Sequence, residues 1–135
     1  MLIDKMINKI FPPQETLKNK KEYEIPYSKN FRGFKRFHVV VHGYEESEKN
    51  NENLYNQDLS SMTIKFICFD GQQGRMAFLY ADKYKLGAVF DDDQIYAIEH
   101  KKIEKIHFEP KEEEIVGKLI TKTRHRISVL VKYKE

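Results

Sequence analysis

The 135-residue sequence has a single cysteine, Cys68, and no tryptophan. One cysteine cannot form an intramolecular disulfide, and a chain without disulfides fits a reducing compartment. Cys68 lies in the apolar run MTIKFICF. In such a run a free cysteine is more often a small buried hydrophobic residue than a nucleophile. The fold must therefore be stabilised by a hydrophobic core and not by covalent cross-links.

Long hydrophobic runs are also missing. No stretch reaches the roughly 18 apolar residues that a membrane-spanning helix needs, so we expect no membrane span. The first residues, MLIDKMINKIFPP, contain neither an uninterrupted apolar region nor the small-residue cleavage site of a signal peptide. The sequence therefore predicts a cytoplasmic protein.

The chain has no large excess of charge of either sign. It carries 24 basic and 21 acidic side chains, with a formal net charge of +3. This small excess allows a local basic patch but does not require a nucleic-acid partner. Hydrophobic residues make up 40% of the chain and aromatic residues 13%. That composition is typical of a globular protein, and the length predicts a single domain over residues 1–135.

The common catalytic motifs are absent. The sequence contains no GxGxxG after a strand, no GxxxxGK[ST], no GxSxG and no CxxC. No pair of carboxylates with suitable spacing stands out for acid–base chemistry. We therefore expect a protein that is not an enzyme and that has no cofactor.

Two patterns could suggest a metal site. His38 and His42 are separated by three valines, which favour a β-strand. Four strand residues span about 13 Å, whereas two ligands of one zinc ion each lie about 2 Å from it. The aspartates of 91–93 lack the alternating spacing of a calcium loop and favour a turn. The sequence therefore predicts no metal site.

The N-terminal third divides into two parts. In residues 1–11, apolar residues recur at helical spacing, and two prolines follow at positions 12 and 13. This pattern predicts an amphipathic helix that ends before the prolines. Residues 12–33 are polar, and we expect a linker across the surface with a short edge strand at Tyr23–Ile25.

From residue 34 onward, apolar residues recur at every second position, which is typical of a β-strand. Phe37, Val39 and Val41 are expected to face the core. Residues 46–58 are polar, and we expect them to form a mobile loop. The remaining strand candidates are MTIKFICF and RMAFLYAD, which DGQQG joins, then KLGAVF, IYAIEH, KIEKIHFE, EIVGKLITKT and RISVLVKYK. We expect a turn at Asp91–Gln94 and another near Arg124 and His125.

These candidates predict a mainly β protein over residues 34–135. Seven or eight short strands at regular spacing are typical of a small antiparallel barrel or sandwich, here with the N-terminal helix packed against it. Residues 111–123 leave an alternative. Glutamates in a first helical turn would favour a helix and an α+β fold, whereas Gly117 and the nearby threonines favour a strand.

Two basic patches are candidate binding surfaces. The first lies in FRGFKRF, where two arginines flank a phenylalanine that we expect to be exposed. The second is the outward face of the last hairpin, whose cations could contact phosphates without reading sequence. The residues of the two patches are Arg32, Phe34, Arg36, Lys118, Lys122, Arg124, Arg126, Lys132 and Lys134.

The functional hypothesis is a small binding module that contacts another protein. Its candidate surfaces are the N-terminal helix, the acidic 46–58 segment and the basic terminal hairpin. An alternative is a nucleic-acid-binding protein that uses both basic patches, and a third is a barrel that encloses a small apolar ligand. The sequence indicates no particular oligomeric state.

Overall fold

The structure, a computed structural model, describes residues 17–135. The predicted helix over residues 1–11 and the first residues of the predicted linker lie outside the described residues. Within residues 17–135, no helix has the length and apolarity needed to cross a membrane.

A four-stranded antiparallel sheet forms one side of the molecule. Its strand order is β1-β3-β4-β5. The strands are β1 (Lys18–Glu24), β3 (Ile64–Gly71), β4 (Gly74–Ala81) and β5 (Tyr84–Val89). The predicted DGQQG hairpin is confirmed, because Gly71 pairs with Gly74 across the turn between β3 and β4. The central strand β3 buries residues on both of its faces, and it lies between β1 and β4 and packs within the core.

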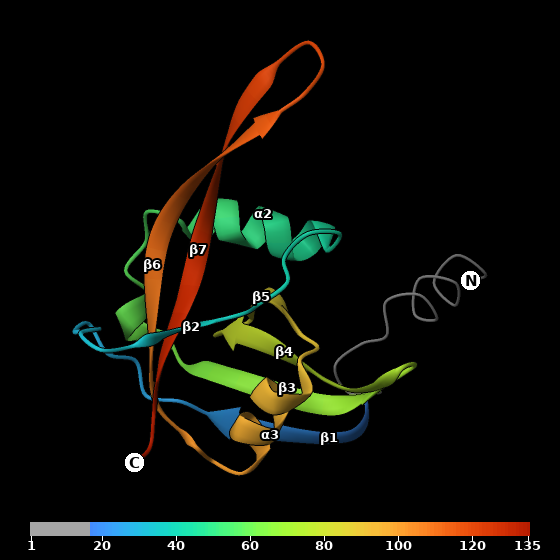
Figure 1. Cartoon of the computed structure of the whole chain (residues 1–135), viewed down its shortest axis with the longest axis vertical. Coiled ribbons are helices and arrows are strands. Elements are labelled where there is room, and N and C mark those ends of the chain that lie inside the picture. The colour runs from blue at the N-terminus through green and yellow to red at the C-terminus, as the bar shows by residue number, and fades with distance from the viewer. Residues whose placement is uncertain (1–16) are drawn as a thin grey trace.

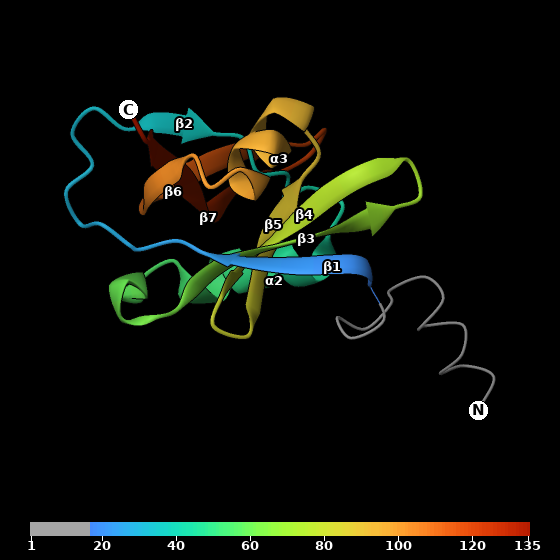
Figure 2. The same cartoon turned by 90° about the horizontal axis from the view of Figure 1, so that it is seen from below.

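A three-stranded antiparallel sheet with the order β2-β7-β6 forms the other side. Its strands are β2 (Lys35–Phe37), β6 (Ile103–Val116) and β7 (Thr121–Tyr133). Figure 2 shows the two sheets on opposite sides of the molecule. The prediction of a mainly β, antiparallel fold is confirmed. The sheets do not close into a barrel, which removes the basis for an enclosed apolar ligand.

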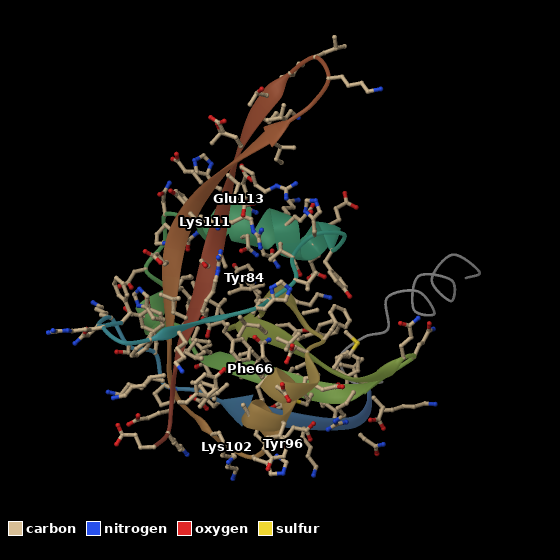
Figure 3. The ribbon with its side chains drawn as sticks, viewed as in Figure 1. Phe66, Tyr84, Tyr96, Lys102, Lys111 and Glu113 are labelled. Atoms are coloured by element: carbon tan, nitrogen blue, oxygen red, sulfur yellow. The ribbon has the colours of Figure 1, made fainter. Side chains whose placement is uncertain are left out.

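The hydrophobic core lies between the two sheets. Phe66 of β3 is fully buried, and its ring centroid lies 5.4 Å from that of Phe37 in β2 (Figure 3). Phe108, Val129 and other apolar residues of β6 and β7 belong to the same cluster. Each sheet therefore covers the apolar face of the other, as two-layer packing requires.

The predicted alternation around the paired histidines is confirmed. Phe37, Val39 and Val41 are buried, while His38 and His42 are exposed. Val40 pairs with Ala88 of β5 through two backbone hydrogen bonds of 2.7 and 2.9 Å. The segment is therefore extended and links the two sheets.

The predicted mobile loop at 46–58 is wrong. Helix α2 occupies Glu45–Leu54, and a short 3₁₀ helix, η2, follows at Leu59–Ser61. The buried residues of α2 are Ser47, Asn51 and Leu54. They recur at helical spacing, but two of them are polar, so hydrophobic periodicity does not reveal the helix. Acidic residues in its first turn stabilise the helix, because their negative charge interacts favourably with the positive end of the helix dipole.

The predicted strand IYAIEH is also wrong, and the predicted turn before it begins a helix. Helix α3 spans Asp92–Glu99. The Asp91 carboxylate accepts a hydrogen bond from the backbone N–H of Gln94 at 3.0 Å, which is an N-terminal cap. Ile95 and Ile98 are buried one helical turn apart. The aspartates thus mark a helix start rather than a turn between strands.

Three further predictions need correction. The edge strand β1 covers Lys18–Glu24, so it is longer than the short strand expected at Tyr23–Ile25. Strand β6 continues through Pro110, where the sequence suggests an end. The last turn lies at residues 117–120 and not near Arg124 and His125, which are within β7. The helical alternative for 111–123 is wrong, because most of this segment is strand.

Pro110 is compatible with β6 because of its place in the ladder. The backbone N–H of Ile106 donates to the carbonyl of Pro26, and its carbonyl accepts from the N–H of Ser28. The backbone groups of Ile106 therefore point away from β7. Every second residue of a strand points its backbone groups to the same edge, so position 110 faces the outer edge as Ile106 does. A proline there removes no hydrogen bond to β7, which agrees with the preference of proline for edge strands.

Candidate functional site

The hairpin of β6 and β7 extends well beyond the two-sheet body (Figure 1). In the part of the hairpin that belongs to the body, the side chains of Ile106, Phe108, Val129 and Val131 are buried. Beyond Ile127 no side chain of either strand is fully buried. We call residues 115–122 the hairpin tip, and residues 111–114 with 123–126 the hairpin shaft.

The hairpin tip ends in a tight turn. The backbone N–H of Gly117 donates a hydrogen bond of 2.9 Å to the carbonyl oxygen of Ile120. A Cβ atom on residue 117 would lie only 2.9 Å from that same oxygen. The glycine is therefore needed because the two strands approach so closely at this point.

Large aliphatic side chains of the hairpin tip face solvent. The exposed fraction is 96% for Leu119, 78% for Val116 and 67% for Ile120. Exposed single hydrophobic residues are normal on protein surfaces, but several of them within five residues of a projecting turn are a candidate interaction site. The sequence pattern predicts Leu119 to face inward, and this prediction is wrong because the strands have left the core before residue 119.

The cations of the hairpin shaft are paired with carboxylates of the same chain. Arg126 donates hydrogen bonds of 3.0 and 3.2 Å from Nη1 to the two oxygens of Glu113. Lys111 Nζ lies 3.9 Å from Glu113 Oε1, and Figure 3 shows both residues on the hairpin. His125 Nε2 lies 3.4 Å from Glu112 Oε1. The positive charge of the shaft is therefore largely compensated.

Helix α2 supports the base of the shaft. Arg124 Nη1 lies 2.8 Å from His42 Nδ1, and Arg124 Nη2 lies 3.9 Å from a carboxylate oxygen of Glu48 in α2. The ring of His125 packs against Tyr55, with 4.5 Å between centroids. These contacts orient the hairpin relative to the body.

The lysines of the hairpin tip differ from the shaft cations. Lys118 and Lys122 are exposed, and neither forms an ion pair with any acid of residues 17–135. The tip thus combines four exposed aliphatic side chains, including the less exposed Ile115, with two ammonium groups that have no ion-pair partner within residues 17–135.

The first predicted basic patch lies elsewhere on the molecule. Arg32 and Phe34 belong to a turn in which Gly33 has a φ of +79° and the N–H of Phe34 bonds to the Phe31 carbonyl. Arg36 lies in β2 opposite Leu130 of β7. Leu130 is eight residues from Lys122, about 26 Å along the strand at about 3.3 Å per residue. Arg36 is therefore far from the lysines of the hairpin tip, but it lies near Lys132 of the second patch, which is two residues from Leu130 on the same strand.

Arg36 lines a shallow groove of about 400 Å³ with residues of β6 and β7. The two remaining predicted cations, Lys132 and Lys134, lie near the end of β7. Lys132 Nζ is 3.7 Å from Glu104 Oε2, and the backbone N–H of Lys134 bonds to the carbonyl of Lys102. Of the nine predicted residues, only Lys118 and Lys122 are part of the hairpin tip.

The prediction that Cys68 is buried is confirmed. Burial, with a smaller contribution from the Glu99 carboxylate, raises the pKa of the Cys68 thiol to about 12. The reactive species of a cysteine is the thiolate, and a thiol with this pKa stays protonated at neutral pH. Among residues 17–135, no group of three or more His, Cys, Asp or Glu side chains is arranged to hold a metal ion.

Comparisons with known proteins supply no relative. A scan against models of protein families, a search of curated proteins and a search of solved structures each find no match for this chain. Any function proposed for the candidate site must therefore be argued from the geometry of the site itself.

Proposed function

We propose that this chain is a small, non-enzymatic, cytoplasmic binding module that contacts another protein through its hairpin tip. The observation that supports this most is the exposure of Val116, Leu119 and Ile120 at the end of a projecting hairpin (Figure 1). Full burial of one such side chain is favourable by about 1.5–3 kcal/mol. Burial of all three side chains in a partner's pocket would therefore supply a large part of the binding free energy.

The anchor is presented in a defined orientation. The shaft contacts Glu48 and Glu52 of α2 through Arg124 and His125, and the close turn at Gly117 limits the conformations of the tip. A preorganised element loses less conformational entropy on binding than a flexible loop does. The hairpin is thus better suited to a specific contact than to a diffuse one.

Nucleic-acid binding is the second candidate function. It is supported by Arg32 and Arg36, which form no ion pair within residues 17–135. Phe34, which the sequence predicts to be exposed, is only half-exposed, whereas Phe31 is exposed and its ring stacks on His107 with 4.3 Å between centroids. The shaft cations support it less, because Arg124 and Arg126 already contact Glu48 and Glu113. Single-strand binding would use aromatic stacking and cations together. A mobility shift that Arg32→Glu with Arg36→Glu removes would favour this candidate.

A photo-crosslinker at the hairpin tip tests the proposed function. Benzoylphenylalanine in place of Leu119 should crosslink to one protein when the full chain is irradiated in a lysate of its source cells. The crosslinks should map to a single region of that protein, since a specific interface places residue 119 at one location. Mass spectrometry of the crosslinked peptides is the measurement.

The control is the same crosslinker in place of Tyr96, a half-exposed aromatic residue of α3. Figure 3 shows Tyr96 at the end of the molecule opposite the hairpin tip. Position 96 should not give the product that position 119 gives. Identical products from both positions, or products only with nucleic acid from position 119, would contradict the proposal.

A further inference from the structure

The charges of the hairpin tip are distributed differently from those of the shaft. Lys118 precedes Leu119, and Lys122 follows Ile120 by two residues. Both lysines lack an ion pair within residues 17–135, whereas Arg124 and Arg126 of the shaft each contact a carboxylate. The exposed aliphatic group is thus flanked by uncompensated positive charge.

We propose that the hairpin tip binds a protein partner with an apolar pocket whose rim carries carboxylates. This inference rests on the proposed function and names the chemistry of the partner's site. When Leu119 and Ile120 enter a pocket, the two ammonium groups come to lie at its edge. Carboxylates at that edge would compensate them, and such charge complementarity favours the correct encounter and rejects other partners.

The depth of the contact is limited by an acidic residue. Glu114 is exposed and forms no ion pair with a cation of residues 17–135. It lies two residues before Val116, about 7 Å along the strand. The partner's carboxylates must therefore contact the tip and not the shaft, because deeper insertion would bring them against Glu114.

The same arrangement disfavours two other partners. An anionic bilayer presents negative charge over its whole surface, so insertion of the tip would bring the glutamates of 112–114 towards lipid phosphates. A single-stranded nucleic acid needs flat rings for base stacking, and the tip has no aromatic side chain. A protein pocket with localised carboxylates avoids both conflicts.

Charge reversal at the tip tests this inference. The protein that crosslinks to position 119 is purified, and its dissociation constant for the full chain is measured by calorimetry. Lys118→Glu with Lys122→Glu should weaken binding by about tenfold or more at low salt, because two attractions become repulsions. The difference should shrink in 1 M NaCl, where the screening length is about 3 Å. Replacing the partner's mapped carboxylates with lysines should restore binding to the reversed tip.

The matched control is Lys20→Glu with Lys21→Glu in β1, which changes net charge equally on exposed lysines away from the hairpin. This control should leave the dissociation constant within about twofold of the unmodified chain. Equal weakening by both double variants, or no weakening by either, would overturn the inference while the crosslink at position 119 still supports the proposed function. Crosslinking of position 119 to lipid, to nucleic acid or to a second copy of this chain would overturn the inference directly.

Discussion

Replacing Phe66 with alanine should lower the free energy of unfolding by about 3–5 kcal/mol, the cost of removing a large aromatic side chain from a core. Phe66 is fully buried in the central strand β3, and its ring contacts Phe37 of the opposite sheet. The substitution removes this contact and leaves a cavity that the two sheets cannot close without moving. Urea unfolding of the full chain, followed by circular dichroism, measures the loss.

A loss of this size is large compared with the total stability of about 5–15 kcal/mol that is typical of such proteins. Phe66→Leu should cost less, because it retains most of the buried apolar volume. The control is Phe90→Ala, since Phe90 is half-exposed and its ring stacks on Tyr44 with 6.3 Å between centroids. The control should cost less than about 1 kcal/mol. Equal losses at positions 66 and 90 would contradict the placement of the core between the sheets.

Asn51→Ala should lower the free energy of unfolding by about 2–4 kcal/mol, because it leaves buried polar groups without partners. The Asn51 amide of α2 donates to the carbonyl of Leu86 in β5 at 2.8 Å. Its oxygen accepts from the backbone N–H of Ile127 in β7 at 3.1 Å. One buried side chain thus connects the helix to both sheets, close to the base of the hairpin shaft.

Asn53→Ala provides the matched control, because it changes the same residue type in the same helix at an exposed position. It should alter stability by less than about 0.5 kcal/mol. Asn51→Asp should also destabilise, since a carboxylate can accept from Ile127 but cannot donate to Leu86. Stability equal to that of the unmodified chain in Asn51→Ala would show that α2 does not depend on these bonds.

The alternating segments of the fold were predictable from sequence because one face of each is apolar. Phe37, Val39 and Val41 follow a period of two, and their burial agrees with it. The apolar run around Cys68 correctly indicated a strand. In both cases the local pattern and the tertiary environment agree.

Helices α2 and α3 were missed for different reasons. The buried face of α2 contains Ser47 and Asn51, and the burial of Asn51 is compensated by hydrogen bonds to residues far along the chain. No local pattern contains that information. For α3 a signal was present, since Asp91 as a cap and Ile95 with Ile98 at helical spacing describe a helix start.

A correct prediction of the candidate site required the correct position of the last turn. A turn at residues 117–120 places Glu113 opposite Arg124 and Glu112 opposite His125 in the ladder. The glutamates therefore lie beside the shaft cations and compensate them, which the turn expected near Arg124 does not allow. The exposure of Leu119 could not be predicted from local sequence, because it depends on whether any other element packs over the hairpin tip, and within residues 17–135 none does.

The central claim is that the hairpin tip anchors a protein partner. Its most direct test is the dissociation constant of a variant in which apolar residues of the tip are replaced. Leu119→Asp with Ile120→Asp should weaken binding of the purified partner by about a hundredfold or more, since both changes place a charge in an apolar contact. The free energy of unfolding should stay within about 0.5 kcal/mol of the unmodified chain, because both side chains are exposed. An unchanged dissociation constant in this variant would contradict the account.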